Sequence, residues 1–373
     1  MAINTATITY HASHNYGSML QAYALQQTLL GLGYGNRIIN LRTARQKEMY
    51  SRPWDRFPCS LRDFLIEAKH LPFRNALQKK HDLFEEFIKN ELQVTREYAS
   101  AEELKETADE YDCFIAGGDQ IWNTFPVDFD WSFYLPFTER KKISYSASMG
   151  PAAEKEISER EKVGSLLKRF SSISVREEGT QRMVEKLSGM NAEIHIDPTL
   201  LLDTEQWRKM AGKERLIDGD YILVYSPLFK KDVYEIAMKL GKRFGMKVVT
   251  SNHVIYHKPS VWGLEYHLEA GPKEFLNMVD NARLVVCGSY HAILFSKIME
   301  TPFLAVNGDK DNRMSTFLKR AGLAGRSIDT ASLCDEGRIK EDNIFSCHFG
   351  KANEYTDIER KKSIDYLIKS IEG

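Results

Sequence analysis

Residues 5–34 read TATITYHASHNYGSMLQAYALQQTLLGLGY, and this stretch passes from a β-branched run through a polar turn into a helical pattern. The run 5–10 predicts a buried strand. Asn15 is a good helix-capping residue, and Gly17 permits close approach of the backbone. The apolar residues that follow recur at helical spacing and predict a helix with one face packed on a sheet: Ala22, Leu25, Leu29 and Leu32. Strand, turn and helix in this order form the unit from which α/β folds are built.

Similar runs alternate with helical patterns along the whole chain, which is typical of α/β units with largely parallel sheets. The predicted strands are TATITY (5–10), NRIINL (36–41), DCFIAG (112–117), KISYSA (142–147), SISVRE (172–177), EIHID (193–197), YILVYS (221–226), MKVVTS (246–251), RLVVCG (283–288) and PFLAVN (302–307). This alternation predicts two doubly wound, Rossmann-like domains, with an active site in the cleft between them at the carboxyl ends of the strands.

A polar stretch over 203–220 separates the two sets of strands, so we expect an N-terminal domain over 1–205 and a C-terminal domain over 215–373. Residues 43–110 carry helical patterns with hardly any strand signal, and they predict a helical insertion in the first domain. Their mixture of basic and aromatic residues is compatible with peripheral contact with an anionic membrane surface. A solvated helical face is the alternative.

The composition is that of an ordinary folded protein, since 43% of the 373 residues are hydrophobic and 28% are charged. The formal net charge is -1, whereas a dedicated nucleic-acid binder needs a clustered basic excess, so we expect no nucleic-acid partner. The first residues lack the basic and apolar segments of a secretory signal, and no apolar run is long enough to cross a bilayer. The sequence therefore predicts a cytoplasmic protein.

Dense polar residues follow the predicted strand 112–117 in the stretch DCFIAGGDQIWN. Paired glycines after a buried strand let the backbone turn sharply beside a ligand, and Asp119, Gln120 and Asn123 come next. The stretch is neither a phosphate-binding P-loop nor the spaced dinucleotide fingerprint. It indicates a ligand-binding turn, with a capped tight turn as the alternative.

Arg176 stands at the end of the predicted strand 172–177, where a guanidinium can bind a phosphate or a carboxylate with two hydrogen bonds. The alternative pairs Arg176 with a neighbouring acidic residue as a structural bridge. Asp197 ends the next predicted strand, where it either orients a ligand or caps the turn.

The second half of the chain places Ser289 and His291 at a predicted helix start, in RLVVCGSYHAILFSKIMETPFLAVN. The helix dipole there favours anions, and a histidine at this place is a candidate general acid or base. Lys297 lies farther along the same helix, and Arg313 comes near the start of the next helix.

These stretches, in this order and spacing, resemble the polysaccharide pyruvyl transferase family. The likeness runs through NYGSMLQAYALQQTLLGLGY, AGGDQIWN, SYSASMG, SVREEGT, IDPTLLLD, SYHAILFSKIMETPFLAVN and NRMSTFL. The sequence departs from the family pattern at Ala292, because members commonly have glycine after the motif histidine.

The resemblance implies a fold similar to the two-domain GT-B glycosyltransferases, with the acceptor on the N-terminal domain and the donor on the C-terminal domain. It implies a transferase that moves pyruvate from phosphoenolpyruvate onto a sugar, often galactose or an N-acetylhexosamine, as a cyclic ketal. The acceptor would be a lipid-linked saccharide at the inner face of the cytoplasmic membrane, destined for an exopolysaccharide or capsule.

This chemistry needs groups that bind a phosphate and a carboxylate, one acid and one base. We expect His291 to act as acid or phosphate ligand and Asp119 as base. The residues expected at the donor are Arg176, Ser289, Lys297 and Arg313. Those expected at the acceptor are Asn15, Tyr16, Gln120 and Asn123. No metal or other cofactor is expected, because arginine and lysine can neutralise the leaving phosphate.

Two other functions fit the same sequence. One is a GT-B glycosyltransferase that uses a nucleotide-sugar donor. The other is a non-catalytic carbohydrate-binding scaffold, against which the presence of His291, Arg176 and Arg313 argues. The sequence predicts neither the acceptor sugar and its linkage nor the oligomeric state.

Overall fold

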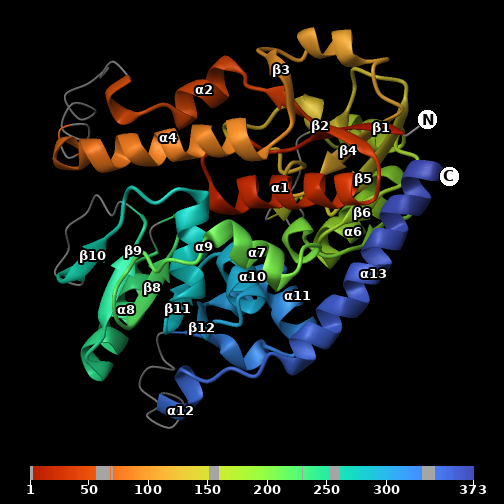
Figure 1. Cartoon of the computed structure of the whole chain (residues 1–373). Helices are drawn as coiled ribbons and strands as arrows, with labels where there is room; N and C mark the ends of the chain where they lie inside the picture. Colours follow the sequence, from red (N-terminus) through yellow and green to blue (C-terminus); the bar gives the residue numbers. More distant parts are fainter. Residues whose placement is uncertain are drawn as a thin grey trace. The chain divides into compact units, whose positions relative to one another are not determined.

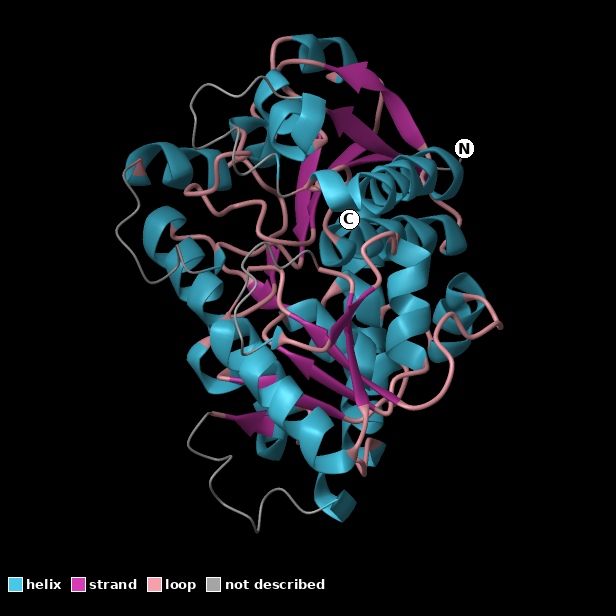
Figure 2. Cartoon of the chain, turned by 90° about the vertical axis from the view of Figure 1, so that its left-hand side faces the viewer, coloured by secondary structure: helices cyan, strands magenta, loops and turns pink. Residues whose placement is uncertain are grey.

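The computed structural model describes residues 3–55, 68, 70–150, 159–228, 230–252, 261–329 and 341–373. Its strands form two large parallel sheets and one small one, with helices alongside (Figures 1 and 2). The chain divides into two units. Unit 1 comprises Met1–Tyr50, Glu86–Leu202 and Tyr355–Gly373, and unit 2 comprises Ser51–Glu85 and Asp203–Glu354.

The sheet of unit 1 has the strand order β3-β2-β1-β4-β5, and every neighbouring pair is parallel. Its strands are β1 (Asn4–Ile8), β2 (Gly35–Leu41), β3 (Val94–Tyr98), β4 (Cys113–Gly117) and β5 (Lys141–Tyr145). The short strands β6 (Ser174–Val175) and β7 (Glu193–Ile194) pair with each other, and single bridges join residues 172 and 175 to the region of β5. All of β4 is buried, as expected for a central strand covered by helices on both faces.

Helix α1 (Tyr16–Gly31) follows β1 as predicted and is capped by Asn15. Among the described residues, further helical elements of unit 1 include α2 (Ala44–Tyr50), η3 (Glu103–Thr107), η4 (Trp131–Tyr134), α5 (Arg160–Leu167), α6 (Glu178–Ser188) and η6 (Pro198–Leu200). Aromatic side chains fill much of the core, where the rings of Trp122 and Tyr134 stack with centroids 5.5 Å apart. This packing holds the loop after β4 against the sheet.

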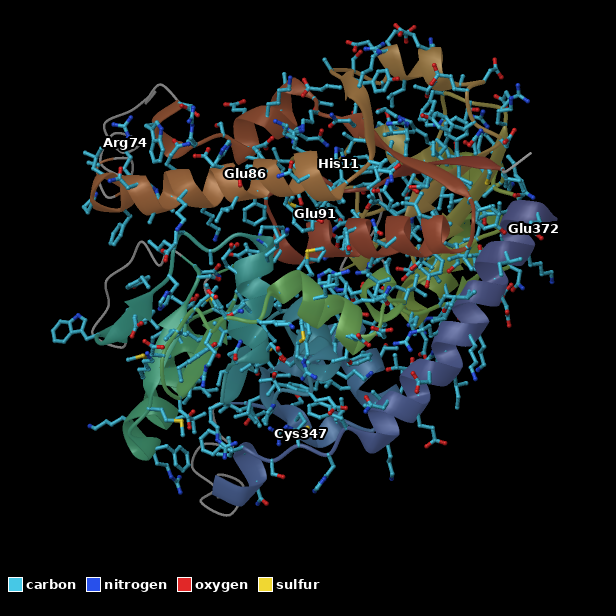
Figure 3. The ribbon with its side chains drawn as sticks, in the orientation of Figure 1. His11, Arg74, Glu86, Glu91, Cys347 and Glu372 are labelled. Carbon is cyan, nitrogen blue, oxygen red and sulfur yellow. The ribbon has the colours of Figure 1, made fainter. Side chains whose placement is uncertain are left out.

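The C-terminal helix α13 (Gly350–Glu372) returns the end of the chain to unit 1 from Tyr355 onward. Tyr366 donates a hydrogen bond to the backbone oxygen of Ser144 at 2.9 Å. Tyr34 donates to Glu372 Oε1 at 2.8 Å, and Figure 3 shows Glu372 at the end of the helix. The last helix is therefore fastened to the same sheet as the first strand.

The sheet of unit 2 has the order β10-β9-β8-β11-β12-β13 and is also parallel throughout. Its strands are β8 (Tyr221–Tyr225), β9 (Lys247–Thr250), β10 (Leu264–Tyr266), β11 (Leu284–Cys287), β12 (Phe303–Val306) and β13 (Ser327–Ile328). Its helical elements include α7 (Thr204–Ala211), α8 (Lys231–Phe244), α9 (Pro272–Asp280), α10 (Tyr290–Ile298), η8 (Gly308–Lys310), α11 (Asn312–Arg320), η9 (Ala324–Arg326) and α12 (Glu341–Ile344). Strands β8, β11 and β12 are buried along their whole length.

Both sheets therefore begin with the 3-2-1-4-5 strand order of the Rossmann fold, and the predicted fold class is confirmed. The expected domain ranges, 1–205 and 215–373, differ from the units at three places, and the smallest difference is residues 203–205, which belong to unit 2. Residues 355–373 belong to unit 1, because α13 bonds to the first sheet, and residues 51–85 belong to unit 2.

The expected insertion over 43–110 is largely helical, with α2, η1 (Pro53–Asp55), η2 (Leu71–Phe73) and α4 (Arg74–Glu91), but it also holds the edge strand β3. Residues 56–67 and 69 of this range lie outside the described residues. Within the part of the chain that the structure describes, no helix is both long and apolar enough to cross a membrane.

Candidate functional site

The strand order of unit 1 reverses between β1 and β4, so the loops after these two strands leave the sheet in opposite directions. Ligands of open parallel sheets bind at such a reversal, beyond the carboxyl ends of the strands. Residues 9–15 follow β1, and residues 118–130 follow β4. The predicted acceptor residues lie in these loops or at the start of α1.

Asn15 acts first as a helix cap. Its side-chain oxygen accepts hydrogen bonds from the backbone N–H groups of Gly17 at 3.0 Å and Ser18 at 3.4 Å. The side-chain amide N–H groups of Asn15 are not used by the cap, and they remain donors for a ligand. Tyr16, the first residue of α1, is almost fully buried, so its role at an acceptor stays a prediction.

Asp119 stands where β4 ends, in a left-handed backbone conformation with φ of +49°. Gly118 before it has φ of +69°, and a Cβ there would overlap the side chain of Gln21, so only glycine fits this turn. The Ser18 hydroxyl of α1 donates a hydrogen bond to Asp119 Oδ2. The turn thus brings the predicted base against the start of α1, in a strained conformation of the kind that clusters at functional sites.

Arg176 lies just after β6, and its buried guanidinium faces two carboxylates. Its Nη2 is 2.9 Å from Asp197 Oδ2, and its Nη1 is 4.0 Å from Asp119 Oδ1. Asp197 also accepts hydrogen bonds from the backbone N–H of Thr199 at 2.9 Å and from its hydroxyl at 2.7 Å. This geometry agrees with the alternative in which Arg176 pairs with an acidic residue as a structural bridge. It also links Arg176 to the predicted base, and the role of Arg176 at the donor stays a prediction.

A further buried carboxylate, Glu177, follows Arg176 in the chain and was not among the predicted site residues. Glu177 accepts hydrogen bonds from the hydroxyls of Ser148 at 2.8 Å and Thr180. Glu177 is the residue that precedes α6, and its partner Thr180 lies in the first turn of that helix. Its contacts are therefore those of a residue that joins the loop after β5 to α6.

Gln120 and Asn123 are brought together, since Asn123 Nδ2 donates to Gln120 Oε1 at 3.0 Å. Asn123 Oδ1 accepts from the backbone N–H of Phe125 at 3.2 Å, so the side chain also shapes its own turn. Both of the alternatives drawn from the sequence, a capped turn and a polar site, are compatible with these contacts.

In unit 2 the strand order reverses between β8 and β11, and the predicted donor residues follow β11. Ser289 is the N-terminal cap residue of α10, and His291 lies buried in the first turn of that helix. A Cβ on Gly288 would come within 3.0 Å of Val233, so glycine allows the turn to lie against α8. The helix start therefore places backbone N–H groups and an imidazole at the position where a parallel sheet binds anions.

Arg313 also lies beyond the carboxyl ends of these strands, in the first turn of α11, which follows β12. Its guanidinium carbon lies 5.6 Å from the ring centre of Tyr290, the first residue of α10. Arg313 Nη2 is 3.0 Å from Asp311 Oδ2, and Asp311 caps α11. Burial works to raise the pKa of Asp311, but Arg313 and the backbone N–H bonds outweigh it, so the pKa is lowered. Arg313 is thus held in place as a cation.

Lys297 is buried in the last turn of α10, six residues after His291. Six residues correspond to about 9 Å along a helix and to a different face. The structure therefore joins Ser289, His291 and Arg313 at one edge of the sheet and places Lys297 deeper in the unit. Asp311 and Tyr290 were not singled out from the sequence as partners of Arg313. Asp311 could have been recognised, because an aspartate directly before a predicted helix is a common N-terminal cap.

The sequence model of the family described as polysaccharide pyruvyl transferase matches residues 15–310. The chain belongs to this family. The matched segment contains Asp119, His291 and Lys297, and Arg313 follows three residues after its end. No curated protein sequence matches the chain.

The fold of this pyruvyl transferase family member is similar to that of several solved structures of other proteins. UDP-GlcNAc 2-epimerase of Methanocaldococcus jannaschii, in complex with UDP-GlcNAc and UDP, has a TM-score of 0.54 at 12% identity, covering 97% of this chain and 99% of that one. An α-glucosyltransferase in complex with UDP and a 13-mer DNA has a TM-score of 0.54 at 7% identity, with 100% of both chains covered. A putative UDP-N-acetylglucosamine 2-epimerase of Listeria monocytogenes has a TM-score of 0.54 at 10% identity, covering 100% of this chain and 96% of that one. The fold is GT-B-like, as expected.

Proposed function

We propose that the protein transfers pyruvate from phosphoenolpyruvate to a sugar of a lipid-linked saccharide and closes it into a cyclic ketal. Galactose and N-acetylhexosamines are the proposed acceptors, and a capsular or exopolysaccharide is the proposed destination. The observation that carries this proposal is the family match over residues 15–310, which includes both catalytic candidates.

The side chains at the carboxyl ends of the two sheets differ in chemistry, which supports binding of a different substrate by each unit. The edge of unit 1 offers the carboxylate of Asp119 and the amides of Asn15, Gln120 and Asn123, which are groups that bind sugar hydroxyls. The edge of unit 2 offers a helix start, His291 and Arg313, which are groups that bind phosphate and carboxylate. We therefore assign the acceptor to unit 1 and phosphoenolpyruvate to unit 2.

In the proposed reaction a general acid protonates C3 of phosphoenolpyruvate, which turns C3 into a methyl group and makes C2 electrophilic. A sugar hydroxyl adds to C2 and loses its proton to a base, and phosphate leaves with the electrons of its C–O bond. A neighbouring hydroxyl then bonds to C2, gives its proton to the phosphate that has left, and closes the ketal. We assign the acid to His291 and the first base to Asp119, while Arg313 stabilises the phosphate charge.

Arg176 acts in this proposal mainly through Asp119. Its charge lies 4.0 Å from one oxygen of Asp119 and keeps that carboxylate oriented between α1 and β6. No resident metal is needed for the proposed chemistry, because cationic side chains neutralise the leaving phosphate.

The decisive experiment incubates the purified protein with phosphoenolpyruvate and a panel of lipid-linked galactosyl and N-acetylhexosaminyl acceptors. Phosphate should appear in step with an acceptor whose mass has grown by a pyruvate ketal. Omission of either substrate is the control. An unchanged acceptor across the whole panel contradicts the proposal.

The same samples separate the two alternatives. The M. jannaschii epimerase structure holds UDP and UDP-GlcNAc, so a nucleotide-sugar donor is the natural competitor for this fold. A ligand that binds the folded protein raises its melting temperature. Phosphoenolpyruvate should raise it and UDP should not. The reverse result favours a glycosyltransferase, and sugar binding without turnover favours a scaffold.

A further inference from the structure

A second carboxylate, Asp128, lies in the loop after β4, the same loop that begins with Asp119. It is 7% exposed. The hydroxyl of Tyr50, the last residue of α2, donates a hydrogen bond to Asp128 Oδ2. The backbone oxygen of Asp128 accepts from Gln46 Nε2 of the same helix at 3.1 Å. Helix α2 therefore fixes both the backbone and the carboxylate of this residue.

Tyr10 belongs to the loop after β1, and its side chain packs on the element that follows the loop after β4. Its ring packs against Phe133 with centroids 4.7 Å apart, and the residue is 8% exposed. The Tyr10 hydroxyl is buried and has no hydrogen-bond partner among the described residues. Burial raises the pKa of Tyr10, and the nearby charges of Asp128 and Asp119 raise it further. Both carboxylates thus act on one buried hydroxyl.

Two more hydroxyls belong to the loop after β1 or to the start of α1. Ser13, which precedes α1, also has a buried hydroxyl without a hydrogen-bond partner in the described part of the chain. Ser18 is bonded to Asp119. His14 and Tyr50 are only partly buried, and their rings lie 6.0 Å apart, so they form the exposed side of the cluster. Buried polar groups are almost always satisfied in native proteins, so a buried hydroxyl without a protein partner is a candidate contact for a ligand or an ordered water.

We propose that Asp128, oriented by Tyr50, accepts a hydrogen bond from a second hydroxyl of the acceptor sugar, beside the hydroxyl bound by Asp119, with Tyr10 and Ser13 completing the acceptor site. This inference rests on the proposed pyruvyl transfer. A cyclic ketal joins two hydroxyls of one sugar, so both must be held near the same carbon of the donor. Two carboxylates in one loop, each fixed by a hydroxyl from a different helix, meet this requirement.

Asp128→Asn and Tyr50→Phe test the proposal, because each keeps the size of the side chain and changes its hydrogen bonding. The chain offers a matched control at the opposite edge of the same sheet, where Tyr34 donates to Glu372 at 2.8 Å. Tyr34 is 7% exposed, and burial and Glu372 raise the pKa of its hydroxyl to about 12, so this pair too joins a tyrosine hydroxyl to a carboxylate, here that of the exposed Glu372. Tyr34→Phe and Glu372→Gln therefore report what the loss of such a bond does to the fold alone.

We expect Asp128→Asn to raise the KM for the acceptor by about 10-fold to 100-fold, the effect of losing a hydrogen bond to a charged group. The KM for phosphoenolpyruvate should stay within about 2-fold of the parent value, because the substitution leaves unit 2 untouched. Tyr50→Phe should shift the acceptor KM in the same direction by less. The control variants should leave both KM values unchanged.

An acceptor KM unchanged in both Asp128→Asn and Tyr50→Phe overturns the proposal, as does an equal rise in the KM values of acceptor and phosphoenolpyruvate. Saturation-transfer NMR with methyl β-galactopyranoside and methyl N-acetyl-β-glucosaminide separates this result from failure of the proposed function. If the parent protein transfers no pyruvate but binds a glycoside more tightly than Asp128→Asn does, the sugar site stands and the reaction falls. If Asp128→Asn binds both glycosides like the parent, or the parent binds neither, the inference falls.

Discussion

Replacing Arg176 by methionine should destabilise the protein far more than loss of a surface charge does. The guanidinium is buried, its 2.9 Å partner Asp197 is fully buried, and Asp119 lies 4.0 Å away. Removal of one partner leaves the other charge uncompensated, which typically costs about 3–5 kcal/mol of unfolding free energy. At roughly 2–4 °C per kcal/mol for a domain of this size, the melting temperature should fall by about 6–20 °C.

Urea unfolding followed by circular dichroism measures this loss. The control is Arg140→Met, because Arg140 pairs with Asp109 at 3.0 Å on the surface, and an exposed pair contributes about 1 kcal/mol or less. Adding Asp197→Asn to Arg176→Met should recover part of the loss, with a coupling of roughly 1–3 kcal/mol. If Arg176→Met is as stable as Arg140→Met and only phosphoenolpyruvate binding is lost, Arg176 is a donor ligand and the structural reasoning is refuted.

Burial lowers the pKa of His195, so the unfolded chain binds a proton near its ordinary pKa of about 6.5 while the folded protein does not. Stability should fall as the pH drops from 7 through this value, by up to about 1.4 kcal/mol per pH unit, and His195→Gln should flatten the melting temperature between pH 7 and 5.5. Burial, reinforced by Arg169, lowers the pKa of Lys142 to about 8. Lys142→Met should therefore raise the melting temperature at pH 7, and the gain should shrink as the pH rises from 8 towards 10. His291→Ala should lower pyruvyl transfer by about 10²–10⁴-fold, and Arg313→Ala should raise the KM for phosphoenolpyruvate, both with nearly unchanged melting temperatures.

Each of these expectations has a simple contrary result. A pH profile of His195→Gln that follows the parent between pH 7 and 5.5 removes the buried imidazole from the account of acid sensitivity. A Lys142→Met variant less stable than the parent at pH 7 shows that the ammonium group is well paired. Normal turnover in His291→Ala, or a normal KM in Arg313→Ala, removes that residue from the proposed site.

The central strands could be predicted because they are buried on both faces and therefore read as continuous apolar runs. YILVY and LVVC are such runs, and they became β8 and β11. The edge strand β3 reads VTREY, with two charged residues exposed to solvent, so its sequence carries no such signal. Assignment of residues 355–373 to unit 1 depends on hydrogen bonds such as that from Tyr366 to Ser144, which local patterns do not encode.

In the candidate site, too, local sequence predicts where single residues lie but not which distant residues they contact. The positions of Asp119, Asn15 and His291 in the fold were predictable, because each residue lies directly after a strand or at the start of the helix that follows it, while their roles stay predictions. The partners of these residues were not predictable. Asp128 lies nine residues beyond Asp119, among aromatic residues, and only the fold brings Tyr50 of α2 to it. A structural bridge from Arg176 to a neighbouring acidic residue was one of two open alternatives, and only the structure identifies Asp197, 21 residues along the chain, as the 2.9 Å partner.

The bonds of α13 to the first sheet set an order of events during synthesis on the ribosome. Strand β13, the last of the second sheet, is translated by residue 328, whereas unit 1 needs Tyr355–Gly373. Domains usually fold in the order in which they emerge, N-terminal first. Here the unit that holds β1 includes Tyr355–Gly373, which are made after every strand of the second sheet, so a chain that lacks these residues would leave the first sheet without its contacts to α13.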